Sequence, residues 1–552
     1  MELLDCRRLT GPNLLWDRPS VMSDIACEGE QTDALAEKFE REVRRLHHAL
    51  GWDEPAFARK TRIGGLSIAF DGPIDRLYAG IALAEAAWAH LASGEDAAEA
   101  LGSILARAKE EANPALITLQ QAASHHAAPF LWDDDEVSIG QGQSVRVWPA
   151  RDLPDPEDID WALPTRIPSA LITGTNGKTT TARMSARILG EGGHRVGLTS
   201  TEGIWLGAQC LNQGDYAGPG GARMILRQTD ASAAVLETAR GGLLRRGLGV
   251  ERADAAVITN IAADHLGDFG SGTMDELLEI KWIISRAVRT HGTLVLNADD
   301  ERLVRQASGY PGRVIWFSLN PDHRKARFRP DQGWLIEEQN GDRTALCQIS
   351  EIPLAMGGAA RHNIANALAA AAVCRSLGAD RDAIAAGLTG LQPADNPGRG
   401  NLYELNGIRV FVDFAHNPQA IQAIADMAAA WPARRRLLAF SQAGDRTDEL
   451  LRECARRGWS LGPERVIISE LAKYARGRAP GEIFGIMRDE LLRNDCSDNQ
   501  IVHVETEPQA LATALRWAEP GDLLVLLILA DAGPVREELG RLGARLSSQF
   551  AR

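Results

Sequence analysis

Short apolar runs alternate with helix-compatible stretches over most of the chain beyond residue 165. Continuous apolar runs predict buried strands at 169–173, 231–236, 255–259 and 292–296, and the stretch 274–289 predicts a helix. Strands buried on both faces are typical of parallel sheets with helices on either side. This part is therefore predicted to form an α/β sheet, mostly parallel, with ligands at the carboxyl ends of its strands.

A second set of the same kind begins near Asn396-Pro397-Gly398. The predicted elements of this set are strands 408–413, 436–440, 464–469 and 522–529 and a helix at 418–430. The pattern indicates a second α/β domain, of Rossmann type. Between the two sets, residues 311–355 contain short β-like pieces, predicted to form a small β insertion before an alanine-rich helix at 363–376.

The segment upstream of both sets has the size of one domain and mixes strands with amphipathic helices. A strand is predicted at 2–8, and helices at 32–50, 75–92 and 97–111. Four prolines between Asp152 and Ser169 indicate a linker, because proline fixes φ and lacks an N–H donor. The predicted organisation is an α+β N-terminal domain (1–160), a central α/β domain with a phosphate loop (166–395) and a C-terminal Rossmann-type domain (396–552).

Composition narrows the class of protein. The chain has 552 residues, 45% of them hydrophobic, and a net charge of −14, which makes nucleic acid an unfavourable partner. The longest strongly apolar run, 523–530, is too short to span a membrane, and the N-terminus lacks the features of a secretion signal. Seven scattered cysteines without a Cys-x-x-Cys pair fit a reducing compartment, so we expect a cytoplasmic protein.

Residues 171–181, Leu-Ile-Thr-Gly-Thr-Asn-Gly-Lys-Thr-Thr-Thr, carry the strongest chemical signal. An apolar strand enters a turn with Gly174 and Gly177, and a helical stretch follows Lys178 and Thr179. Backbone N–H groups and a helix N-terminus bind phosphates, lysine neutralises their charge, and a threonine hydroxyl can ligate Mg²⁺. The spacing is two residues shorter than the common P-loop. A chance glycine turn is the alternative, but strand, glycines, lysine and hydroxyl all stand in the required order.

Three further polar sites lie at or beyond the ends of predicted strands. Glu237 ends the strand 231–236, His265 with Asp264 follows the strand 255–259, and Lys281 lies on the next helix. A carboxylate and an imidazole beside a phosphate loop could hold one or two Mg²⁺ ions. Singly, each has an ordinary alternative: a solvated acid, a capping or packing histidine, and a solvated lysine on a helix face.

Several motifs together resemble the Mur ligases, ATP-dependent enzymes that join an amine to a carboxylate. The motifs are Gly-Thr-Asn-Gly-Lys-Thr-Thr (174–180), Thr-Asn-Ile-x-x-Asp-His-Leu (259–266), Leu-Asn-Ala-Asp-Asp (296–300), Arg-His-Asn-Ile-Ala-Asn-Ala-Leu-Ala-Ala (361–370) and Asp-Phe-Ala-His-Asn-Pro (413–418). The resemblance extends from residue 166 to the C-terminus and implies a central ATP-binding domain followed by a ligase C-terminal domain.

Within that superfamily the chain resembles the cyanophycin synthetases. The carrying stretches are Arg-x-Leu-x-Gly-Pro-Asn (7–13), Gly-Asp-Tyr-Ala-Gly-Pro (214–219), Leu-Glu-Thr-Ala-Arg-Gly-Gly-Leu-Leu-Arg-Arg-Gly-Leu (236–248), Asn-Pro-Gly-Arg (396–399), Gly-Asp-Arg (444–446) and Arg-Gly-Arg-Ala-Pro-Gly-Glu (476–482). That family carries an ATP-grasp domain between its N-terminal domain and its Mur-like half, whereas here only the proline-rich linker stands at that junction. The resemblance implies a chain that catalyses one ligation and cannot polymerise alone.

The resemblance also implies roles for individual residues. The ATP-contacting residues would be Gly174, Thr175, Asn176, Gly177, Lys178, Thr179, Thr180, Asn363, Arg399, Asp413 and His416, with Asn366 a further candidate beside the adenine. Thr179, Glu237, His265 and Lys281 would hold Mg²⁺, and Lys281 stands where many Mur ligases have a carbamylated lysine. Lys178, Glu237, His265 and Lys281 would be the catalytic set.

The substrate pockets rest on weaker signals. Arg240, Arg245 and Arg246 could grip a substrate carboxylate with bidentate geometry, although a solvated basic loop is as good an interpretation for each one alone. Glu470 and Glu482 could recognise a cationic amine, although exposed acids are common.

The predicted function is an ATP-dependent, Mg²⁺-requiring ligase that joins an amino acid or other amine to a carboxylate through an acyl phosphate. The alternative is a catalytically degenerate scaffold that acts with a partner ligase, and a kinase-like NTPase is a narrower third interpretation. The presence of Lys178, Thr179, Glu237, His265, Lys281 and Asp413 together favours the enzyme. We expect a homo-oligomer, dimer or tetramer, with no nucleic-acid or membrane partner and with a partner ligase as a further possibility.

Overall fold

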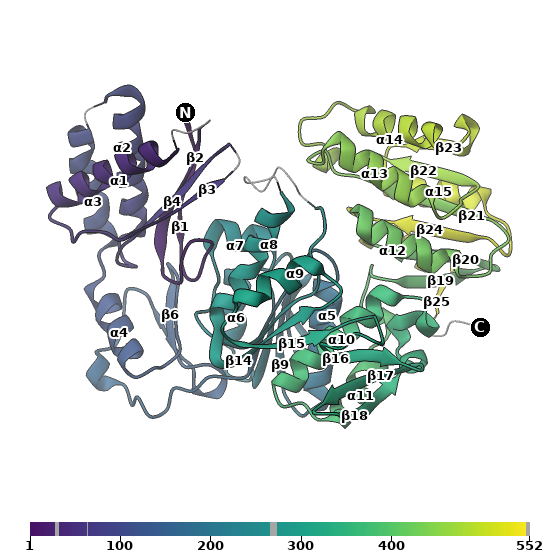
Figure 1. The fold of residues 1–552 in the computed structure, drawn as a ribbon, viewed down its shortest axis with the longest axis horizontal. Helices are drawn as coiled ribbons and strands as arrows, with labels where there is room; N and C mark the ends of the chain where they lie inside the picture. Colours follow the sequence, from purple (N-terminus) through teal and green to yellow (C-terminus); the bar gives the residue numbers. More distant parts are fainter. Residues whose placement is uncertain (28–31, 63, 96, 265–272, 548–552) are drawn as a thin grey trace.

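The computed structural model describes residues 1–27, 32–62, 64–95, 97–264 and 273–547. Figure 1 shows the N-terminal, central and C-terminal strands and helices as successive groups along the chain. The predicted α/β fold class is confirmed, because large, mostly parallel sheets lie between layers of helices. No helix in the described ranges is long and apolar enough to cross a membrane.

The N-terminal part begins with a four-stranded antiparallel sheet in the order β1-β2-β4-β3. Its strands are β1 (Glu2–Leu9), β2 (Ser20–Ala26), β3 (Phe57–Arg62) and β4 (Gly65–Asp71). The helices α1 (Thr32–Ala49) and α2 (Leu77–Ser93) share one apolar core with this sheet, which confirms the predicted strand and helices of this region. The remaining elements are α3 (Leu101–Glu111), α4 (Pro114–His125), β5 (Phe130–Trp132), β6 (Glu136–Ile139) and β7 (Arg146–Pro149).

The proline-rich stretch 152–168 contains no strand or α-helix. Its one regular element is a short 3₁₀ turn at Pro156–Asp158. It joins β7 of the N-terminal part to β8 of the central sheet, as the sequence predicts for a linker.

The central part is built on an eleven-stranded sheet in the order β11-β10-β9-β12-β8-β13-β14-β15-β16-β17-β18. The strands are β8 (Ser169–Thr173), β9 (Val196–Ser200), β10 (Gly203–Leu206), β11 (Gln209–Gln213), β12 (Ala233–Glu237), β13 (Ala253–Ile258), β14 (Val288–Asn297), β15 (Arg313–Phe317), β16 (Ala326–Asp331), β17 (Trp334–Gln339) and β18 (Asp342–Gln348). The phosphate-loop strand β8 lies between β12 and β13 and is parallel to both.

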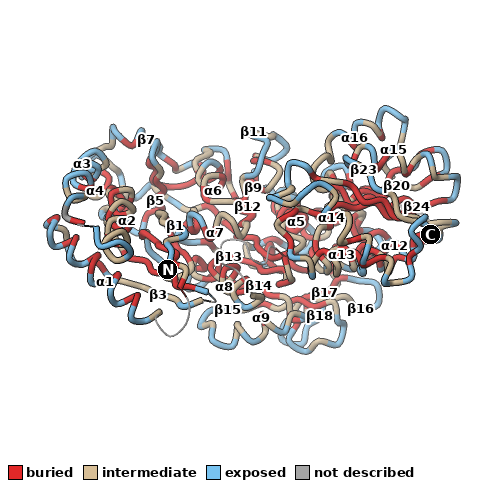
Figure 2. Tube along the Cα trace, turned by 90° about the horizontal axis from the view of Figure 1, so that it is seen from above, coloured by how far each residue is buried: buried red, intermediate tan, exposed pale blue. Residues whose placement is uncertain are grey.

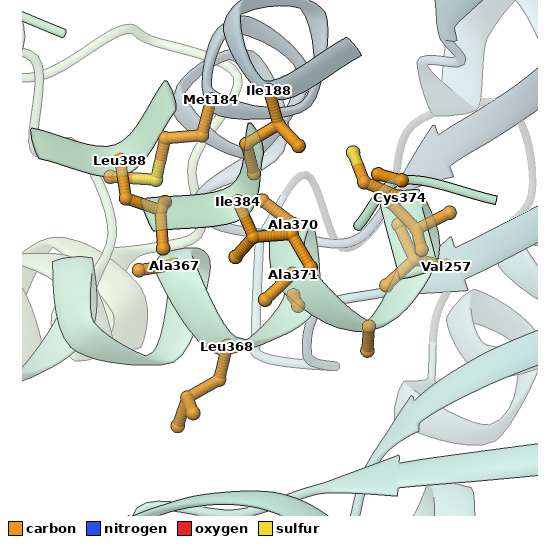
Figure 3. Close-up of a cluster of buried hydrophobic side chains, with 14 of the residues drawn as sticks. Met184, Ile188, Val257, Ala367, Leu368, Ala370, Ala371, Cys374, Ile384 and Leu388 are labelled. Carbon is orange, nitrogen blue, oxygen red and sulfur yellow. The ribbon is translucent and has the colours of Figure 1, made fainter. Parts of the chain in front are cut away.

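Helices cover both faces of this sheet. One apolar core contains α5 (Lys178–Glu191), α10 (Arg361–Ser376) and α11 (Arg381–Gly390). The core on the other face contains α6 (Pro219–Leu226), α7 (Arg240–Arg246), α8 (Met274–Trp282) and α9 (Glu301–Gln306). The small side chains of α10 allow close packing, and Figure 3 shows its alanines between side chains of α5 and α11, such as Ile188 and Leu388.

The C-terminal part contains a seven-stranded sheet in the order β23-β22-β21-β24-β20-β19-β25. Its elements are β19 (Asn401–Leu405), β20 (Ile408–Asp413), α12 (Pro418–Ala429), β21 (Arg436–Ser441), α13 (Asp448–Trp459), β22 (Arg465–Ser469), α14 (Glu482–Arg493), β23 (Ile501–Val504), α15 (Glu507–Trp517), β24 (Leu523–Leu527), α16 (Ala532–Arg541) and β25 (Arg545–Leu546). Figure 2 shows β20 and β24 as buried strands among helices that carry the exposed residues.

Two predicted elements differ from the structure. The helix predicted at 274–289 ends at Trp282, continues as a 3₁₀ turn and becomes strand β14 from Val288, because an apolar stretch without clear periodicity fits helix and strand alike. The segment 311–355 is not a separate insertion: β15 pairs in parallel with β14, and β16 to β18 extend the same sheet. Strand partners are not encoded in the local pattern of a strand.

A buried carboxylate fixes one loop of the C-terminal part. Glu507 is 0% exposed, and its two oxygens accept hydrogen bonds from the backbone N–H groups of residues 529, 530 and 531 and from the Ser441 hydroxyl, at 2.6–2.9 Å. The loop that follows β24 is therefore tied to the end of β21 through one side chain. Leu529 of this loop lines the cavity described below.

Glu507→Gln is expected to lower the free energy of unfolding by about 2 kcal/mol, because the new amide N–H₂ group would face backbone donors in a buried site. Urea unfolding monitored by circular dichroism measures the change. Glu505→Gln is the matched control, since Glu505 is exposed on the same segment and should leave the midpoint unchanged. Equal midpoints for the two variants would contradict the role given to Glu507.

Candidate functional site

A cavity of about 1840 Å³ lies where the carboxyl ends of the central strands face the C-terminal part. Its walls include the loops after β8, β12 and β13, the start of α10, and the loops after β20 and β21. Carboxyl ends of parallel strands are the usual place for ligands in such sheets. The cavity contains most of the residues that the sequence singled out.

The phosphate loop, residues 174–180, leads from β8 into α5. Gly177 has a φ of +85° and precedes the first residue of the helix, Lys178. A Cβ atom at Gly174 or Gly177 would lie 1.8 Å from Thr259 Oγ1 or 2.1 Å from Asn366 Oδ1, so neither position accepts a side chain. The loop therefore leads the N-terminus of α5 to the cavity, as an anion site requires.

Neighbouring loops hold the phosphate loop in place. The N–H groups of Thr175 and Asn176 donate to the backbone carbonyl and the side-chain oxygen of Asn260, at 2.9 and 3.0 Å. The Thr259 hydroxyl donates to the Asn176 carbonyl at 2.6 Å. Sequence reasoning gave Asn260 no role, although it stands within the quoted Thr-Asn-Ile motif.

Lys178 and Glu237 carry opposite charges that lie close enough to affect each other and are largely removed from water. Burial lowers the pKa of Lys178, and the carboxylates of Glu237 and Asp264 oppose that change. Burial raises the pKa of Glu237, and the Lys178 ammonium opposes it. The Lys178 ammonium donates to the Thr175 carbonyl at 2.9 Å, which keeps it at the mouth of the loop.

Glu237 and Thr179 form a set of oxygen atoms suited to a hard cation. The Thr179 hydroxyl donates to Glu237 Oε1 at 3.2 Å and lies 3.5 Å from the Thr201 hydroxyl. The other oxygen of Glu237 is buried and has no hydrogen-bond partner among the described residues. An unsatisfied carboxylate oxygen beside two hydroxyls fits Mg²⁺, which prefers oxygen ligands. The structure describes no group of three or more His, Cys, Asp or Glu side chains arranged around a metal, and His265 lies outside the described residues.

Lys281 reaches the same loop from α8. It is buried, and its ammonium donates to the Gly174 carbonyl at 2.9 Å. Burial and the neighbouring Lys178 charge hold the pKa of Lys281 well below its usual value. The helix face that the sequence left ambiguous thus points into the site.

Several side-chain contacts join the central part to the C-terminal part across the cavity. His416 Nε2 lies 3.2 Å from Asp264 Oδ2, and Arg446 lies 3.1 Å from Asp264 Oδ1. The side-chain amides of Asn176 and Asn417 pair reciprocally at 2.7 and 3.2 Å. Sequence reasoning missed the roles of Asp264, Asn417 and Arg446 as bridging residues, although the quoted motifs contain all three.

Four residues that the resemblance predicts to contact the nucleotide line the cavity: Asn363, Asn366, Arg399 and Asp413. The Asn366 amide donates to Asn363 Oδ1 at 3.0 Å, and the Asn363 amide donates to the Leu354 carbonyl at 2.9 Å. The Arg399 guanidinium stacks 4.1 Å above the ring of Phe414. Asn363 and Asn366 come from one turn of α10, so their juxtaposition follows from helical spacing.

Asp413 ends β20 and is partly buried. Its Oδ2 accepts the N–H of Gly400 at 2.7 Å. Burial raises the pKa of Asp413 to about 6, although Arg399 and the N–H groups of Gly400, Phe414 and Ala415 oppose the change.

The five residues predicted for substrate binding separate into two groups. Arg240 and Arg245 line the cavity from α7. Arg246, Glu470 and Glu482 are not among its lining residues: Arg246 is exposed, Glu470 bonds His503 at 2.8 Å, and Glu482 pairs with Arg478 at 2.7 Å. The substrate roles of all five stay predictions.

Comparison with known proteins locates the family of this chain. Residues 172–374 match the Mur ligase middle domain, and residues 398–527 match the Mur ligase glutamate ligase domain. The chain is 37% identical over 381 residues to the cyanophycin synthetase of Crocosphaera subtropica, which covers 66% of this chain and 42% of that protein. It is 31% identical over 377 residues to the UDP-N-acetylmuramate–L-alanine ligase of Rubrobacter xylanophilus, covering 67% of this chain and 76% of that protein.

Solved structures agree on the fold. FolC of E. coli in complex with DHPP and ADP superposes with a TM-score of 0.53 at 20% identity, over 68% of this chain and 89% of that one. The chain spans less than half the length of the cyanophycin synthetases that it matches, at 42% and 45% for two of them.

Asp413→Asn is expected to change how stability depends on pH. Because the pKa of Asp413 is about 6 in the folded state and its usual value is 3.8, the folded protein binds the proton more tightly, so this group lowers stability as pH rises from 4 to 6. The loss of stability is about 3 kcal/mol over the whole titration, of which about 2 kcal/mol falls between pH 4 and 6. Urea unfolding at pH 4, 5, 6 and 7, without ligands, measures it.

The free energy of unfolding of the wild type is compared with that of Asp413→Asn at each pH. The stability of the wild type relative to Asp413→Asn should fall as pH rises between 4 and 6 and stay level above about 7. A constant difference across this range would show that Asp413 titrates as an ordinary carboxyl.

Proposed function

The chain belongs to the Mur ligase family, and from this membership and the geometry of the cavity we propose that it is an ATP-dependent ligase joining an amine to a carboxylate. The observation that carries the proposal is the single cavity in which a phosphate loop, a buried carboxylate beside hydroxyls, and residues of the C-terminal part meet. The solved structure of E. coli FolC, which has a similar fold, contains ADP, and this supports the proposal that the present fold binds a nucleotide.

The phosphates of ATP would lie on the loop 174–180. Its backbone N–H groups, the N-terminus of α5 and the Lys178 ammonium supply the positive field that stabilises them. Asn363, Arg399 and Asp413 would contact the remainder of the nucleotide, and His416 would approach the phosphates from the C-terminal part.

Mg²⁺ would be held by Thr179 and Glu237. In such sites the ion neutralises the charge that develops on the phosphoryl oxygens. We keep His265 and a carbamylated Lys281 as further proposed ligands. In the unmodified side chain the Lys281 ammonium donates to the Gly174 carbonyl, and its low pKa favours the neutral amine that carbamylation requires.

The reaction would take place in two steps. A carboxylate oxygen of the acid substrate attacks the γ-phosphorus of ATP, which releases ADP and forms an acyl phosphate. The nitrogen of the amine then attacks the carbonyl carbon, and the C–O bond to phosphate breaks as the amide forms and phosphate leaves. Phosphoryl transfer depends on positioning and charge neutralisation, and Arg240 and Arg245 would orient the acid.

Contacts between the central and C-terminal parts would exclude water during this sequence. The Asn176–Asn417 pair and the Asp264–His416 contact connect the two parts beside the phosphate loop. Water would otherwise hydrolyse the acyl phosphate, so closure protects the intermediate.

We propose one ligation per acid site, without polymerisation by this chain alone. The support is the direct passage from the N-terminal part to the central sheet through residues 152–168. A partner ligase, a homo-oligomer and a cytoplasmic location remain predictions of the same proposal.

Phosphate release should require ATP, Mg²⁺, an acid and an amine together. A panel of aspartate-containing peptides, each with arginine or lysine, is incubated with the full chain, phosphate is measured, and mass spectrometry identifies products larger by one amide bond. Lys178→Ala should abolish phosphate release, because the loop loses the ammonium group that would neutralise the charge of the ATP phosphates. ATP binding without turnover of any pair would favour the scaffold function or a requirement for a partner ligase.

Glu237→Gln should lower the rate of phosphate release about 100-fold while nucleotide binding changes little. The amide keeps the size of the side chain and removes the charge that would hold Mg²⁺. Glu191→Gln, at the far end of α5, is the matched control and should retain full activity. Activity of Glu237→Gln equal to that of the control would remove Glu237 from the proposed metal site.

A further inference from the structure

The helix α7, which presents Arg240 and Arg245 to the cavity, has little stability of its own. It has seven residues, two of them glycines, and no side chain caps its N-terminus. Isolated helices of this length are unstable, and glycine lowers helix stability further. Its position must therefore come from its packing and from the groups that bind its ends.

The N-terminal part binds the carbonyl end of α7. Arg7 of β1 donates from Nε to the Leu244 carbonyl at 2.8 Å, and the N–H of Thr10 donates to the Arg246 carbonyl at 2.9 Å. The last carbonyls of a helix lack partners within the helix and form its negative end, so donors and a guanidinium are favourable there.

Arg7 is itself held firmly. Its guanidinium pairs with Asp24 at 2.6 Å and with Asp5 at 2.8 Å, and its side chain is 15% exposed. Asp24 also accepts from Ser67 and pairs with Arg62, so the carboxylate has several partners in the same sheet. A guanidinium fixed in this way can support a carbonyl with little loss of entropy.

The backbone after β1 fits closely against the end of α7. The N–H of Leu248 donates to the Pro12 carbonyl at 2.8 Å, and a Cβ atom at Gly11 would lie 2.5 Å from the Leu248 carbonyl oxygen. Asn13 is 0% exposed and bonds the backbone of its own turn at residues 11, 15, 16 and 18. These residues form the Arg-x-Leu-x-Gly-Pro-Asn motif, whose role the sequence left open.

A second set of contacts reaches the helix that carries Lys281. Lys60 of β3 pairs with Glu279 of α8, and Asp17 pairs with Arg286 directly after α8 at 3.0 Å. The N-terminal part thus contacts both elements that place cationic side chains on one wall of the cavity.

We infer that residues 7–13 act as a clamp that fixes α7, and with it Arg240 and Arg245, so that Arg7 is a positioning residue for the acid substrate. The role in binding the acid substrate rests on the proposed function. The clamp itself rests only on contacts between described residues. Without the clamp, α7 loosens and the two arginines lose their defined places, while the phosphate loop and the nucleotide side stay intact.

Arg7→Ala in the full chain tests the clamp, with Arg8→Ala as the matched control. Arg8 is the next residue of β1 and pairs with Asp134 inside the N-terminal part; within the described ranges it forms no hydrogen bond or ion pair with α7. Hydrogen exchange measured by mass spectrometry should show amides of residues 241–248 exchanging at least about tenfold faster in Arg7→Ala than in Arg8→Ala. Amides of α5 should exchange equally in both, and ADP should bind equally.

Kinetics provide the second readout. With an acid and amine pair from the panel above, Arg7→Ala should raise the KM for the acid about tenfold or more and leave the KM for ATP unchanged. Arg7→Lys, which keeps the charge, should recover part of the loss. Thr10→Val removes the hydroxyl that donates to the Arg246 carbonyl at 3.3 Å and accepts from Arg223 of α6 at 2.8 Å, and it should give a smaller effect of the same kind, even if Arg7→Ala fails to fold.

The outcomes separate the clamp from the proposed function. Unchanged exchange at residues 241–248 in Arg7→Ala and Thr10→Val overturns the clamp, and so does faster exchange with an unchanged KM for the acid. If the wild type ligates no pair, the proposed function fails, and the exchange data still decide whether residues 7–13 hold α7.

Discussion

Burial of charge in one cavity is the constraint on which the rest of the structure depends. Four charged side chains of the cavity are at most partly accessible to water: Lys178, Lys281, Glu237 and Asp264. Charges removed from water are costly unless they are paired or hydrogen-bonded. The backbone carbonyls of Thr175 and Gly174 accept the two ammonium groups, and Thr179, His416 and Arg446 contact the carboxylates. The loops around the cavity are shaped by these contacts, and a phosphate-rich ligand with a cation would complete the compensation.

The groups that compensate these buried charges come from separate parts of the chain. The central sheet supplies the loop and the carboxylates, the C-terminal part supplies His416, Asn417 and Arg446, and the N-terminal part supports α7 and α8. A site assembled in this way depends on the relative placement of its parts, so contacts far from the reacting atoms can change substrate affinity. The two glycines of α7 illustrate the point, because the helix that carries substrate-facing arginines relies on neighbours for its position.

Features with a local cause were predictable from the sequence. The strand at 408–413 is predicted with the observed bounds because a β-branched and aromatic stretch, interrupted by Arg409, ends at Asp413, and the phosphate loop is predicted because its glycines, lysine and threonine lie within seven consecutive residues, 174–180. Features that depend on tertiary pairing were not. The bridging role of Asp264 requires knowledge of where His416 and Arg446 lie, and the partners of Glu470 and Glu482 are visible only once distant segments meet. The segment 283–288 was assigned to a helix because its apolar side chains suit both a helix and a buried strand.

The linker 152–168 makes the contact between the N-terminal part and α7 an event within one molecule. A tether of this kind sets an effective concentration for the two surfaces, which for short connections is on the order of millimolar. The contacts of Arg7, Thr10 and Pro12 with α7, and the ion pairs that Lys60 and Asp17 form with α8 and the turn after it, therefore form without the entropic cost of bringing two separate polypeptides together. Covalent continuity thereby favours every contact that supports α7.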